Sequence, residues 1–323
     1  MEKMKYSFVL PAYKARFFRE AIDSILNQTY SDFELIIVND ASPQDLDSIV
    51  NSYSDERIRY YKNEKNIGGQ DLVAQWNKCL SYTNTDYIIL ASDDDVYSPS
   101  YLEEMDKLVC RYPEVCVFRP RVKRVDEKGN ICHIDGYLSE YLSKVEYLFF
   151  WTSCLIGSGI PFFIFKREAL MSIGGFVNYP LAWFSDDATV FKLADNGIVI
   201  CNKTLFSFRE SGENISTYSN TKESLCAKYS ATKMFSDEFQ SFINNFEPKT
   251  EEDKYLMPFV KKLFVLLINK SKIRSQLKRT SLSVILGTMN YAIELGFSRT
   301  MLLKYCKYPI VSALKNIFSF NRK

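Results

Sequence analysis

The first hundred residues alternate short apolar runs with segments whose apolar positions recur at helical spacing. We interpret the apolar runs as buried β-strands, at Tyr6–Leu10, Glu34–Val38, Ile58–Tyr61 and Tyr87–Ala91. Helices are expected near Arg16–Asn27, Gln44–Ser52 and Gln70–Thr83, with a fourth starting at Pro99. This β-α-β-α order at short spacing predicts an α/β fold with a parallel, doubly wound sheet.

The middle of the chain predicts shorter elements and one long apolar stretch. Residues 147–165 carry no charge over 19 positions, which is the length of a membrane span. Because this stretch contains several Gly, Ser and Pro residues, we expect a helix, a loop and a strand instead. The elements expected after residue 110 are strands at Val115–Phe118, Arg121–Asp126 and Pro161–Phe165, a hairpin turn at Glu127–Asn130, and helices at Lys166–Ile173 and from Ser185 to Asn196.

After about Asn220 the pattern is helical and the charge becomes basic. Residues 254–323 hold 14 Lys and Arg and one acid, whereas residues 1–253 hold 27 basic and 38 acidic residues. We therefore expect an α/β domain at 1–219 and a helical, basic region at 220–323. Such a tail is typical of a segment that meets an anionic membrane surface, and an ordinary solvated helical face is the alternative. It follows no DNA- or RNA-binding motif, so no nucleic acid partner is expected.

Three loops that follow predicted strands carry polar residues, at Asn39–Ser42, Asn66–Gly69 and Ser92–Asp95. Loops at the carboxyl ends of parallel strands share one edge of a sheet, so these loops should converge. The last loop holds three consecutive aspartates, which repel by roughly 4 kcal/mol per pair at about 4 Å in a medium of dielectric about 20. A divalent cation would relieve this repulsion. Capping of the next helix does not explain the triplet, because Ser98 and Pro99 already supply an N-cap and a first-turn proline.

The composition narrows the chemistry to carboxylates. The chain is 46% hydrophobic and can form a large core. Its eight cysteines form no C-x-x-C pair and His133 is the sole histidine, which excludes a recognisable zinc site or histidine-based triad. No charged segment followed by an apolar one opens the chain, so we expect no secretory signal and a cytoplasmic protein with reduced thiols.

Six motifs in order resemble the family 2 glycosyltransferases of the GT-A fold. They are Val9–Tyr13, Val38–Ser42, Asn66–Gly68, Ser92–Asp95 with Pro99, Ile173–Phe176 with Ser185–Asp187, and Arg209–Ser216. Each motif is weak by itself, whereas six in the family's order are specific. The resemblance covers roughly the first two-thirds of the chain. It implies a doubly wound, mixed sheet with a nucleotide-binding half and an acceptor half, in a catalytic domain at 1–219 followed by a helical appendage.

The resemblance also implies an activity. The family transfers a sugar from a nucleotide-diphosphate sugar, here most simply a UDP-sugar, to an acceptor hydroxyl with inversion at the anomeric carbon. A divalent cation, Mn²⁺ or Mg²⁺, is expected to neutralise the diphosphate leaving group. The expected acceptor is a glycan or lipid-linked glycan of cell-surface polysaccharide synthesis. The expected location is the cytoplasm, with peripheral binding to the inner face of the plasma membrane.

By the same resemblance, particular residues receive roles. The residues expected to bind the donor are Pro11, Tyr13, Asp40, Asn66, Gly68, Asp93 and Arg209, and the expected metal ligands are Asp94 and Asp95. Asp40 should accept a hydrogen bond from the nucleobase of the donor, and Asp93 should lie nearer the donor's ribose.

Inversion by single displacement needs one base that takes the acceptor's proton, and Asp186 is the expected base. When this sequence is aligned with the family's acidic pair from Gly197 backwards, Asp186 falls at the position of the family's aspartate. Asp187 falls one position after it. The choice between these two adjacent aspartates stays open at this point.

The sequence departs from the family at three places. Asn39 replaces a usual acid, Gln75–Asn77 replace a segment that often holds an arginine, and Glu210 or Ser211 stands where many members have a histidine. A nucleotide-sugar-binding protein with little or no turnover is therefore the alternative function. A sugar nucleotidyltransferase is less favoured, since Leu10–Arg16 lacks the glycine of a phosphate-binding loop.

Overall fold

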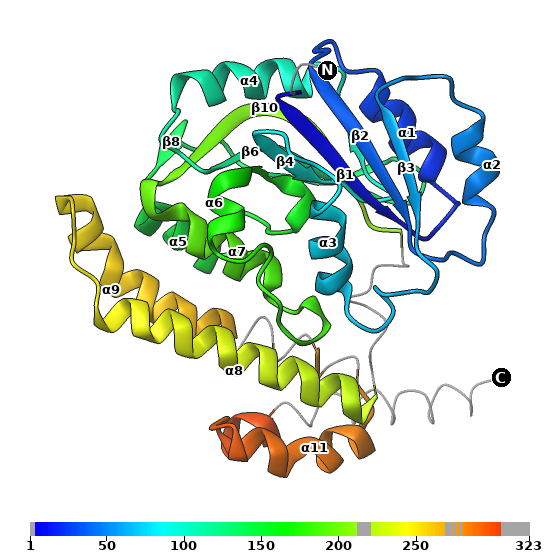
Figure 1. Cartoon of the computed structure of the whole chain (residues 1–323). Coiled ribbons are helices and arrows are strands. Elements are labelled where there is room, and N and C mark those ends of the chain that lie inside the picture. Colours follow the sequence, from blue (N-terminus) through cyan, green and yellow to red (C-terminus); the bar gives the residue numbers. More distant parts are fainter. Residues whose placement is uncertain (1–3, 212–220, 269–272, 274–275, 278–279, 305–323) are drawn as a thin grey trace. The chain divides into compact units, whose positions relative to one another are not determined.

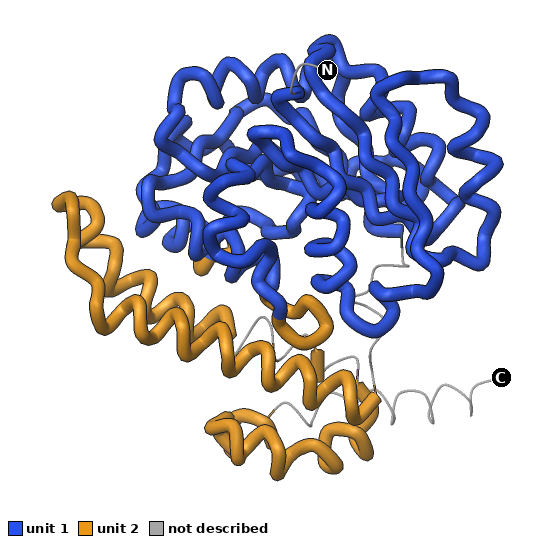
Figure 2. Tube along the Cα trace, in the orientation of Figure 1, with its two compact units in different colours: residues 1–151, 155–178, 185–213 blue, residues 152–154, 179–184, 214–323 orange. Residues whose placement is uncertain are grey.

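The computed structural model describes residues 4–211, 221–268, 273, 276–277 and 280–304. The chain forms two compact units (Figure 2). The first comprises residues 1–151, 155–178 and 185–213, and the second comprises residues 152–154, 179–184 and 214–323. Because the units interleave in sequence, the expected domain border at 219/220 stays a prediction.

The first four strands of the first unit are parallel and neighbours in space (Figure 1). They are β1 (Tyr6–Ala12), β2 (Phe33–Asn39), β3 (Ile58–Lys62) and β4 (Tyr87–Leu90), in the order β3-β2-β1-β4. Every residue of β2 and β4 is buried, so both faces of these strands are covered. The predicted parallel, doubly wound half of the sheet is confirmed.

The second half of the sheet is mixed. The strand β9 (Ile164–Lys166) runs antiparallel to β4, and β6 (Val117–Val125) lies between β9 and β10 (Ile198–Arg209). Three short strands complete the ten described strands, namely β5 (Val96–Tyr97), β7 (Ile131–Ile134) and β8 (Tyr141–Leu142). The turn between β6 and β7 has Gly129 at φ 83°, as a hairpin turn there predicts.

The bounds of three predicted strands were wrong, at two places in the chain, and each place contains a proline. The strands expected at Val115–Phe118 and Arg121–Asp126 are one strand, β6, which runs through Pro120. Pro120 is tolerated because β9 pairs with β6 only as far as Phe118, and because the register with β10 is irregular from Cys201 onward. The strand expected at Pro161–Phe165 begins as a 3-10 helix, η1 (Ile160–Phe162), before β9 starts.

Helices separate the strands of the first unit. They are α1 (Phe18–Leu26), α2 (Leu46–Asn51), α3 (Leu72–Leu80), α4 (Tyr101–Arg111), α5 (Lys144–Thr152), α6 (Arg167–Ser172) and α7 (Ser185–Leu193), with a 3-10 turn η3 (Ala194–Asn196). Asp45 and Asp71 cap α2 and α3 by accepting hydrogen bonds from backbone N–H groups. The expected capping of α4 by Ser98 and Pro99 was wrong, because its N-cap residue is Ser100.

The second unit is helical, as predicted for the C-terminal region. Its described elements are η2 (Pro180–Ala182), α8 (Lys222–Asn244), α9 (Glu251–Leu266) and α11 (Leu282–Glu294). Thr221 and Thr250 cap α8 and α9, and the rings of Phe239 and Phe264 stack at 3.8 Å between these two helices. Within the described ranges, none of the helices combines the length and the apolar character that crossing a bilayer requires.

Candidate functional site

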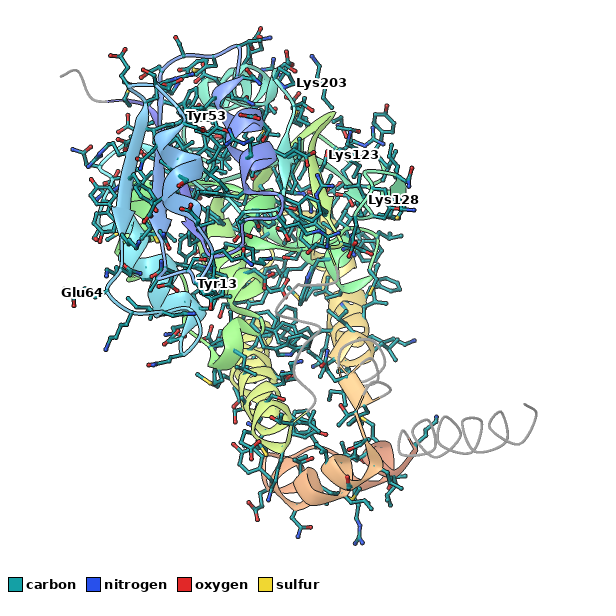
Figure 3. The ribbon with its side chains drawn as sticks, turned by 90° about the vertical axis from the view of Figure 1, so that its right-hand side faces the viewer. Tyr13, Tyr53, Glu64, Lys123, Lys128 and Lys203 are labelled. Carbon is teal, nitrogen blue, oxygen red and sulfur yellow. The ribbon has the colours of Figure 1, made fainter. Side chains whose placement is uncertain are left out.

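The end of β1 meets the loop that follows β4. The backbone N–H groups of Tyr13 and Lys14 donate to Asp93 Oδ2 at 3.0 and 2.8 Å. Ser42, in the loop after β2, donates its hydroxyl to the carbonyl oxygen of Tyr13. Pro11 lies opposite Val38 within the sheet. Tyr13, which is labelled in Figure 3, is an exposed residue, at 40%. The loops after β2 and β4 therefore meet at the end of β1, and the third predicted loop joins the loop after β2, because the N–H groups of Ile67 and Gly68 donate to Asp40.

Asp94 and Asp95, the predicted metal ligands, are 6% and 0% exposed. Asp94 Oδ2 accepts hydrogen bonds from the Ser211 hydroxyl at 2.9 Å and from Lys14 Nζ at 3.3 Å. Asp95 Oδ1 accepts one from the backbone N–H of Arg209 at 2.8 Å. Asp95 Oδ2 is buried, and no residue that the structure describes donates a hydrogen bond to it. The Ser92 hydroxyl also interacts with this carboxylate, and Oδ2 is its candidate ligand atom for a cation.

Burial controls the electrostatics of this cluster. Burial raises the pKa of Asp93, although the charge of Lys14 and two backbone hydrogen bonds oppose the shift. Burial, and after it the charge of Asp94, raise the pKa of Asp95 well above its usual range. Burial also acts to lower the pKa of Lys14, but the charges of Asp93 and Asp94 outweigh it and raise that pKa. Burial therefore disfavours the negative charge of Asp93 and Asp95, and their protein partners do not fully offset this cost.

Asp40 organises the loop that follows β3. Its Oδ1 accepts hydrogen bonds from Asn63 Nδ2 at 2.7 Å and from the N–H of Ile67 at 2.9 Å, and its Oδ2 accepts one from the N–H of Gly68 at 2.7 Å. A Cβ atom at position 68 would lie 3.0 Å from Asp40 Oδ2, so the close approach favours glycine. Asn66 accepts a hydrogen bond from the N–H of the following Gly69. The predicted contact of Asp40 with a base stays a prediction, because both of its oxygens already accept hydrogen bonds within the protein.

Asn39, the departure from the family's acid, has a structural reason. Its Nδ2 donates to the Tyr60 hydroxyl at 2.9 Å and to Asp47 Oδ1 at 3.2 Å, while its Oδ1 accepts from the N–H of Ser42 at 2.9 Å. A carboxylate at this position could not donate and would face the carboxylate of Asp47. The amide therefore joins β2 to both α2 and β3.

Arg209 supports the aspartates from the end of β10. Its Nε donates to the Asp94 carbonyl oxygen at 2.9 Å, and its Nη2 lies 2.7 Å from Glu20 Oε2. The guanidinium also stacks over Phe17 at 4.3 Å, and the side chain is 5% exposed. Its predicted donor contact stays a prediction. The rest of the predicted segment Arg209–Ser216, from residue 212 onward, lies outside the described residues.

Asp186, the predicted base, is the second residue of α7 and is half-buried. Its Oδ1 accepts a hydrogen bond from the N–H of Asp187 at 2.9 Å, whereas Asp187 is 6% exposed. The helix α7 is attached to the preceding turn, because the N–H of Val177 donates to Thr189 Oγ1 at 3.0 Å. The position of Asp186 is therefore set by α7 and this turn.

The Gly-Gly-Phe turn connects α7 with α3. Asn77 accepts a hydrogen bond from the N–H of Phe176 at 2.7 Å and donates to its carbonyl oxygen at 2.9 Å. The ring of Phe176 also packs edge-on against Trp76. The segment Gln75–Asn77, noted above as lacking the common arginine, thus holds this turn in place.

Two residues of the cluster, Lys14 and Ser211, were not expected there from the sequence. Lys14 forms ion pairs with Asp93 at 3.4 Å and Asp94 at 3.3 Å. Ser211 was weighed only as a replacement for a histidine, and it donates to Asp94. The position of Lys14 directly after the first strand was the available signal, because that position shares an edge with the aspartates.

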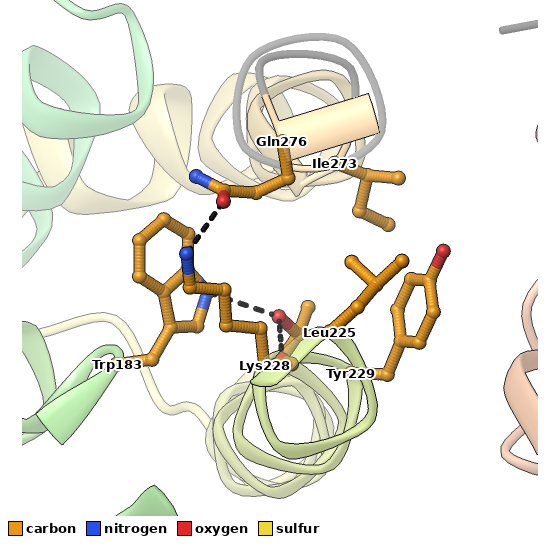
Figure 4. A pocket seen from close by; sticks show the side chains of 7 residues that line it. Trp183, Leu225, Lys228, Tyr229, Ile273 and Gln276 are labelled. Carbon is orange, nitrogen blue, oxygen red and sulfur yellow. Dashed lines mark hydrogen bonds between the residues drawn. The ribbon is translucent and has the colours of Figure 1, made fainter. Parts of the chain in front are cut away.

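A small pocket lies within the second unit, and none of its lining residues is a predicted site residue (Figure 4). Lys228 donates to Gln276 Oε1 at 2.6 Å and lies 5.0 Å from the ring of Trp183, whose Nε1 donates to Thr232. The pocket is lined by Trp183, Leu225, Lys228, Tyr229, Thr232, Ile273 and Gln276. None of these lining residues is a carboxylate, so this pocket does not supply the predicted chemistry.

Comparison with known proteins gives the family. The model of glycosyl transferase family 2 matches residues 7–174, which is more than half of the chain. An uncharacterized glycosyltransferase of Methanocaldococcus jannaschii is 33% identical over 136 residues, which are 41% of this chain and 46% of that protein. An uncharacterized glycosyltransferase of Rickettsia typhi is 36% identical over 98 residues, which are 30% of this chain and 29% of that protein. The chain therefore spans less than half the length of these curated relatives.

Solved structures share the fold over nearly the whole chain. Residues 1–349 of S. aureus TarS, in complex with UDP-GlcNAc, superpose with a TM-score of 0.63 at 16% identity, covering 97% of this chain and 92% of that one. A mannosyltransferase from Pyrobaculum calidifontis, in complex with GDP-Man and Mn²⁺, superposes with a TM-score of 0.54 at 14% identity, covering 98% and 88%. These likenesses confirm the predicted GT-A fold, and together with the match over residues 7–174 they mean that the chain belongs to glycosyl transferase family 2.

Proposed function

We propose that this protein transfers a sugar from a UDP-sugar to an acceptor hydroxyl with inversion at the anomeric carbon. The observation that carries the proposal is the meeting of the loops after β1 and β4 with the end of β10 around buried aspartates, in a chain of glycosyl transferase family 2. In two structures of the same fold, the bound donors are UDP-GlcNAc and GDP-Man. Both are nucleotide-diphosphate sugars, and they support this class of donor.

The residues present fit a divalent cation, Mn²⁺ or Mg²⁺. Asp95 Oδ2 is buried with no hydrogen-bond donor among the described residues, and Asp94 is its neighbour. No group of three or more His, Cys, Asp or Glu side chains in the described ranges is arranged to hold a metal ion. Asp94 and Asp95 would therefore hold the ion with the help of donor phosphate oxygens, as Mg²⁺ sites often do. When bound, the ion supplies positive charge against the diphosphate leaving group.

Asp186 is the proposed base of the reaction. Its half-buried carboxylate lies at the start of α7, where the Gly-Gly-Phe turn and Asn77 fix the helix. The base would accept the acceptor hydroxyl's proton as that oxygen attacks the anomeric carbon on the face opposite the diphosphate. We propose that the donor's nucleobase lies in a pocket lined by Asp40, Gly68 and the backbone near Pro11 and Tyr13. The other proposed contacts of the donor are Asn66, Asp93 and Arg209.

We place this activity in residues 1–219 and assign to residues 220–323 a role at a membrane. The proposed acceptor is a glycan or lipid-linked glycan of a cell-surface polysaccharide. The helix α9 supports this assignment, because Tyr255 and Phe259 are 71% and 57% exposed beside exposed lysines.

A thermal-shift panel tests the donor and the ion together. UDP, GDP, UDP-GlcNAc and GDP-Man are each added with Mn²⁺, with Mg²⁺ or with EDTA. A ligand at a hundredfold excess over its Kd stabilises the folded state by about 2.7 kcal/mol, so a true donor raises the melting temperature. The proposal predicts stabilisation by the uridine compounds that weakens when EDTA removes the ion.

Turnover separates the proposed enzyme from its alternative. The nucleotide that stabilises the protein is offered as its sugar donor, and release of the nucleoside diphosphate is measured with a glycan acceptor. Binding without any release, across a panel of acceptors, would favour the nucleotide-sugar-binding protein. Release of pyrophosphate from a nucleoside triphosphate would instead indicate a nucleotidyltransferase.

A further inference from the structure

The Lys14 ammonium group lies beside carboxylates of the proposed divalent-cation site. Its Nζ is 3.4 Å from Asp93 Oδ1 and 3.3 Å from Asp94 Oδ2, and these carboxylates are almost fully buried. The ammonium group and a metal ion at Asp94 and Asp95 would use the same Asp94 carboxylate. Two cations that share one carboxylate weaken each other's binding, because each takes up part of the same negative charge.

The Lys14 ammonium group is held by long contacts and can move away from the aspartates. Charge-assisted N–H···O hydrogen bonds are usually about 2.7–2.9 Å long, whereas both contacts of Lys14 exceed 3.2 Å, at 3.3 and 3.4 Å. Its side chain is 29% exposed, so it has a path to solvent. By contrast, the carboxylate of Asp93 is held by the backbone N–H groups of Tyr13 and Lys14, which do not depend on the lysine side chain.

We propose that Lys14 is a positioning residue that serves as an internal counter-ion for Asp93 and Asp94 and competes with the divalent cation for Asp94. This inference rests on the proposed function, since it takes the metal site to be Asp94 and Asp95. In the absence of metal, Lys14 keeps the buried aspartates partly neutralised. Binding of the metal displaces its ammonium group from Asp94, which leaves a cation at the edge of the donor site.

The test measures Mn²⁺ binding to the full chain by electron paramagnetic resonance, with Mn²⁺ alone as the probe. Lys14→Met removes the charge and keeps most of the side-chain volume. We expect it to tighten Mn²⁺ binding by roughly 5- to 20-fold, within the usual range of coupling between two ligands. Lys14→Arg keeps the charge and should bind Mn²⁺ within about twofold of the unsubstituted protein. The matched control is Lys107→Met, because Lys107 also contacts two carboxylates, Glu103 and Glu104, and should change nothing.

The outcomes separate this inference from the proposed function. One outcome is that Lys14→Met binds Mn²⁺ no more tightly than the unsubstituted protein, while Asp95→Asn abolishes binding. This result overturns the role of Lys14 and supports the metal site. Mn²⁺ binding that survives Asp95→Asn, or no binding by any of these proteins, overturns the metal site and this inference with it. A merely structural role of Lys14 would lower stability and weaken the site, which is opposite in sign to the expected gain.

Discussion

At the scale of single residues, Asn39 shows how one amide can replace the acid that its family usually has. Its Nδ2 contacts Asp47 and the Tyr60 hydroxyl, and that hydroxyl also hydrogen-bonds to Asp47 Oδ1. We predict that Asn39→Asp lowers the free energy of unfolding by about 1–3 kcal/mol, because the two carboxylates would then share one hydroxyl proton. Urea unfolding followed by circular dichroism measures the loss.

The control for this prediction is a double-mutant cycle with Asp47→Asn. An amide at position 47 can donate to a carboxylate at position 39, so Asn39→Asp combined with Asp47→Asn should recover more than half of the lost stability. Strictly additive losses would show that residues 39 and 47 do not interact, and would remove this explanation for the amide.

Asp186 and Asp187 differ in exposure, and this difference favours Asp186 as the proposed base. Asp186 is half-buried, whereas Asp187 is 6% exposed and so is less able to reach an acceptor. We predict that Asp186→Asn lowers kcat by about 100- to 10,000-fold, the usual contribution of a general base, while the Kd for the UDP-sugar changes less than about threefold. Steady-state transfer kinetics and calorimetric binding provide the two values.

The companion variant is Asp187→Asn, which should keep at least about tenfold more activity than Asp186→Asn. The opposite order, with the Asp187 variant inactive and still able to bind donor, would move the role of base to Asp187. Normal turnover by both variants would mean that neither aspartate is the base.

At the scale of elements, the Gly-Gly-Phe turn has two glycines with different constraints. Gly174 and Gly175 have φ of 86° and 94°, a conformation that costs other residues about 1–2 kcal/mol. A Cβ at position 174 would meet nothing within 4 Å, whereas one at position 175 would lie 2.4 Å from Asn77 Oδ1. The second glycine is therefore required by backbone conformation and by contact with α3.

These two glycines form a matched pair of variants. Gly174→Ala should cost about 1 kcal/mol of unfolding free energy from backbone strain, and Gly175→Ala about 2–4 kcal/mol, because Asn77 must also move. Asn77 holds Phe176, so the second change should also lower transfer activity by displacing α7. Equal losses in urea unfolding for the two variants would show that the contact with Asn77 carries no energy.

The sequence predicts elements best where both faces are buried. The strands β1, β2 and β4 were predictable because they are continuous apolar runs between turn residues, and the convergence of their loops follows from parallel topology. The bounds of β6 and β9 were not, since the effect of Pro120 and Pro161 depends on which neighbouring strand pairs beside them. The pattern of apolar and polar residues in the sequence does not show which strands pair with each other.

The aspartate cluster could be predicted, but the partners of its members could not. Three carboxylates after a strand are visible in the sequence, whereas Lys14 and Ser211 reach them across 80 and 117 positions of the chain. The contacts of the Arg209 guanidinium with Glu20 and with the ring of Phe17 were likewise not visible in the sequence. Side-chain burial and long-range pairing decide these roles, and both depend on the whole fold.

At the scale of the whole molecule, charge and apolar surface occur together in the C-terminal region. Of residues 254–323, the structure describes 254–268, 273, 276–277 and 280–304. On α9, Lys254, Lys261 and Lys262 are exposed beside exposed Tyr255 and Phe259. Interleaved lysine and aromatic side chains on one helix fit the interface of an anionic bilayer, where the rings enter the headgroup layer and the ammonium groups meet phosphates.

We therefore predict salt-sensitive binding of the full chain to vesicles that contain phosphatidylserine. Each lysine near an anionic surface contributes about 1 kcal/mol, so changing Lys254, Lys261 and Lys262 to Gln should weaken vesicle binding by about 100-fold at low salt. The control changes three exposed lysines of the first unit, Lys107, Lys128 and Lys203, to Gln and alters the net charge equally. Cosedimentation measures both variants. Equal weakening by the two sets would show that only net charge matters. An anionic surface attracts lysines most strongly when screening by salt is weak. If the unsubstituted chain does not bind at low salt, α9 is therefore an ordinary solvated helix.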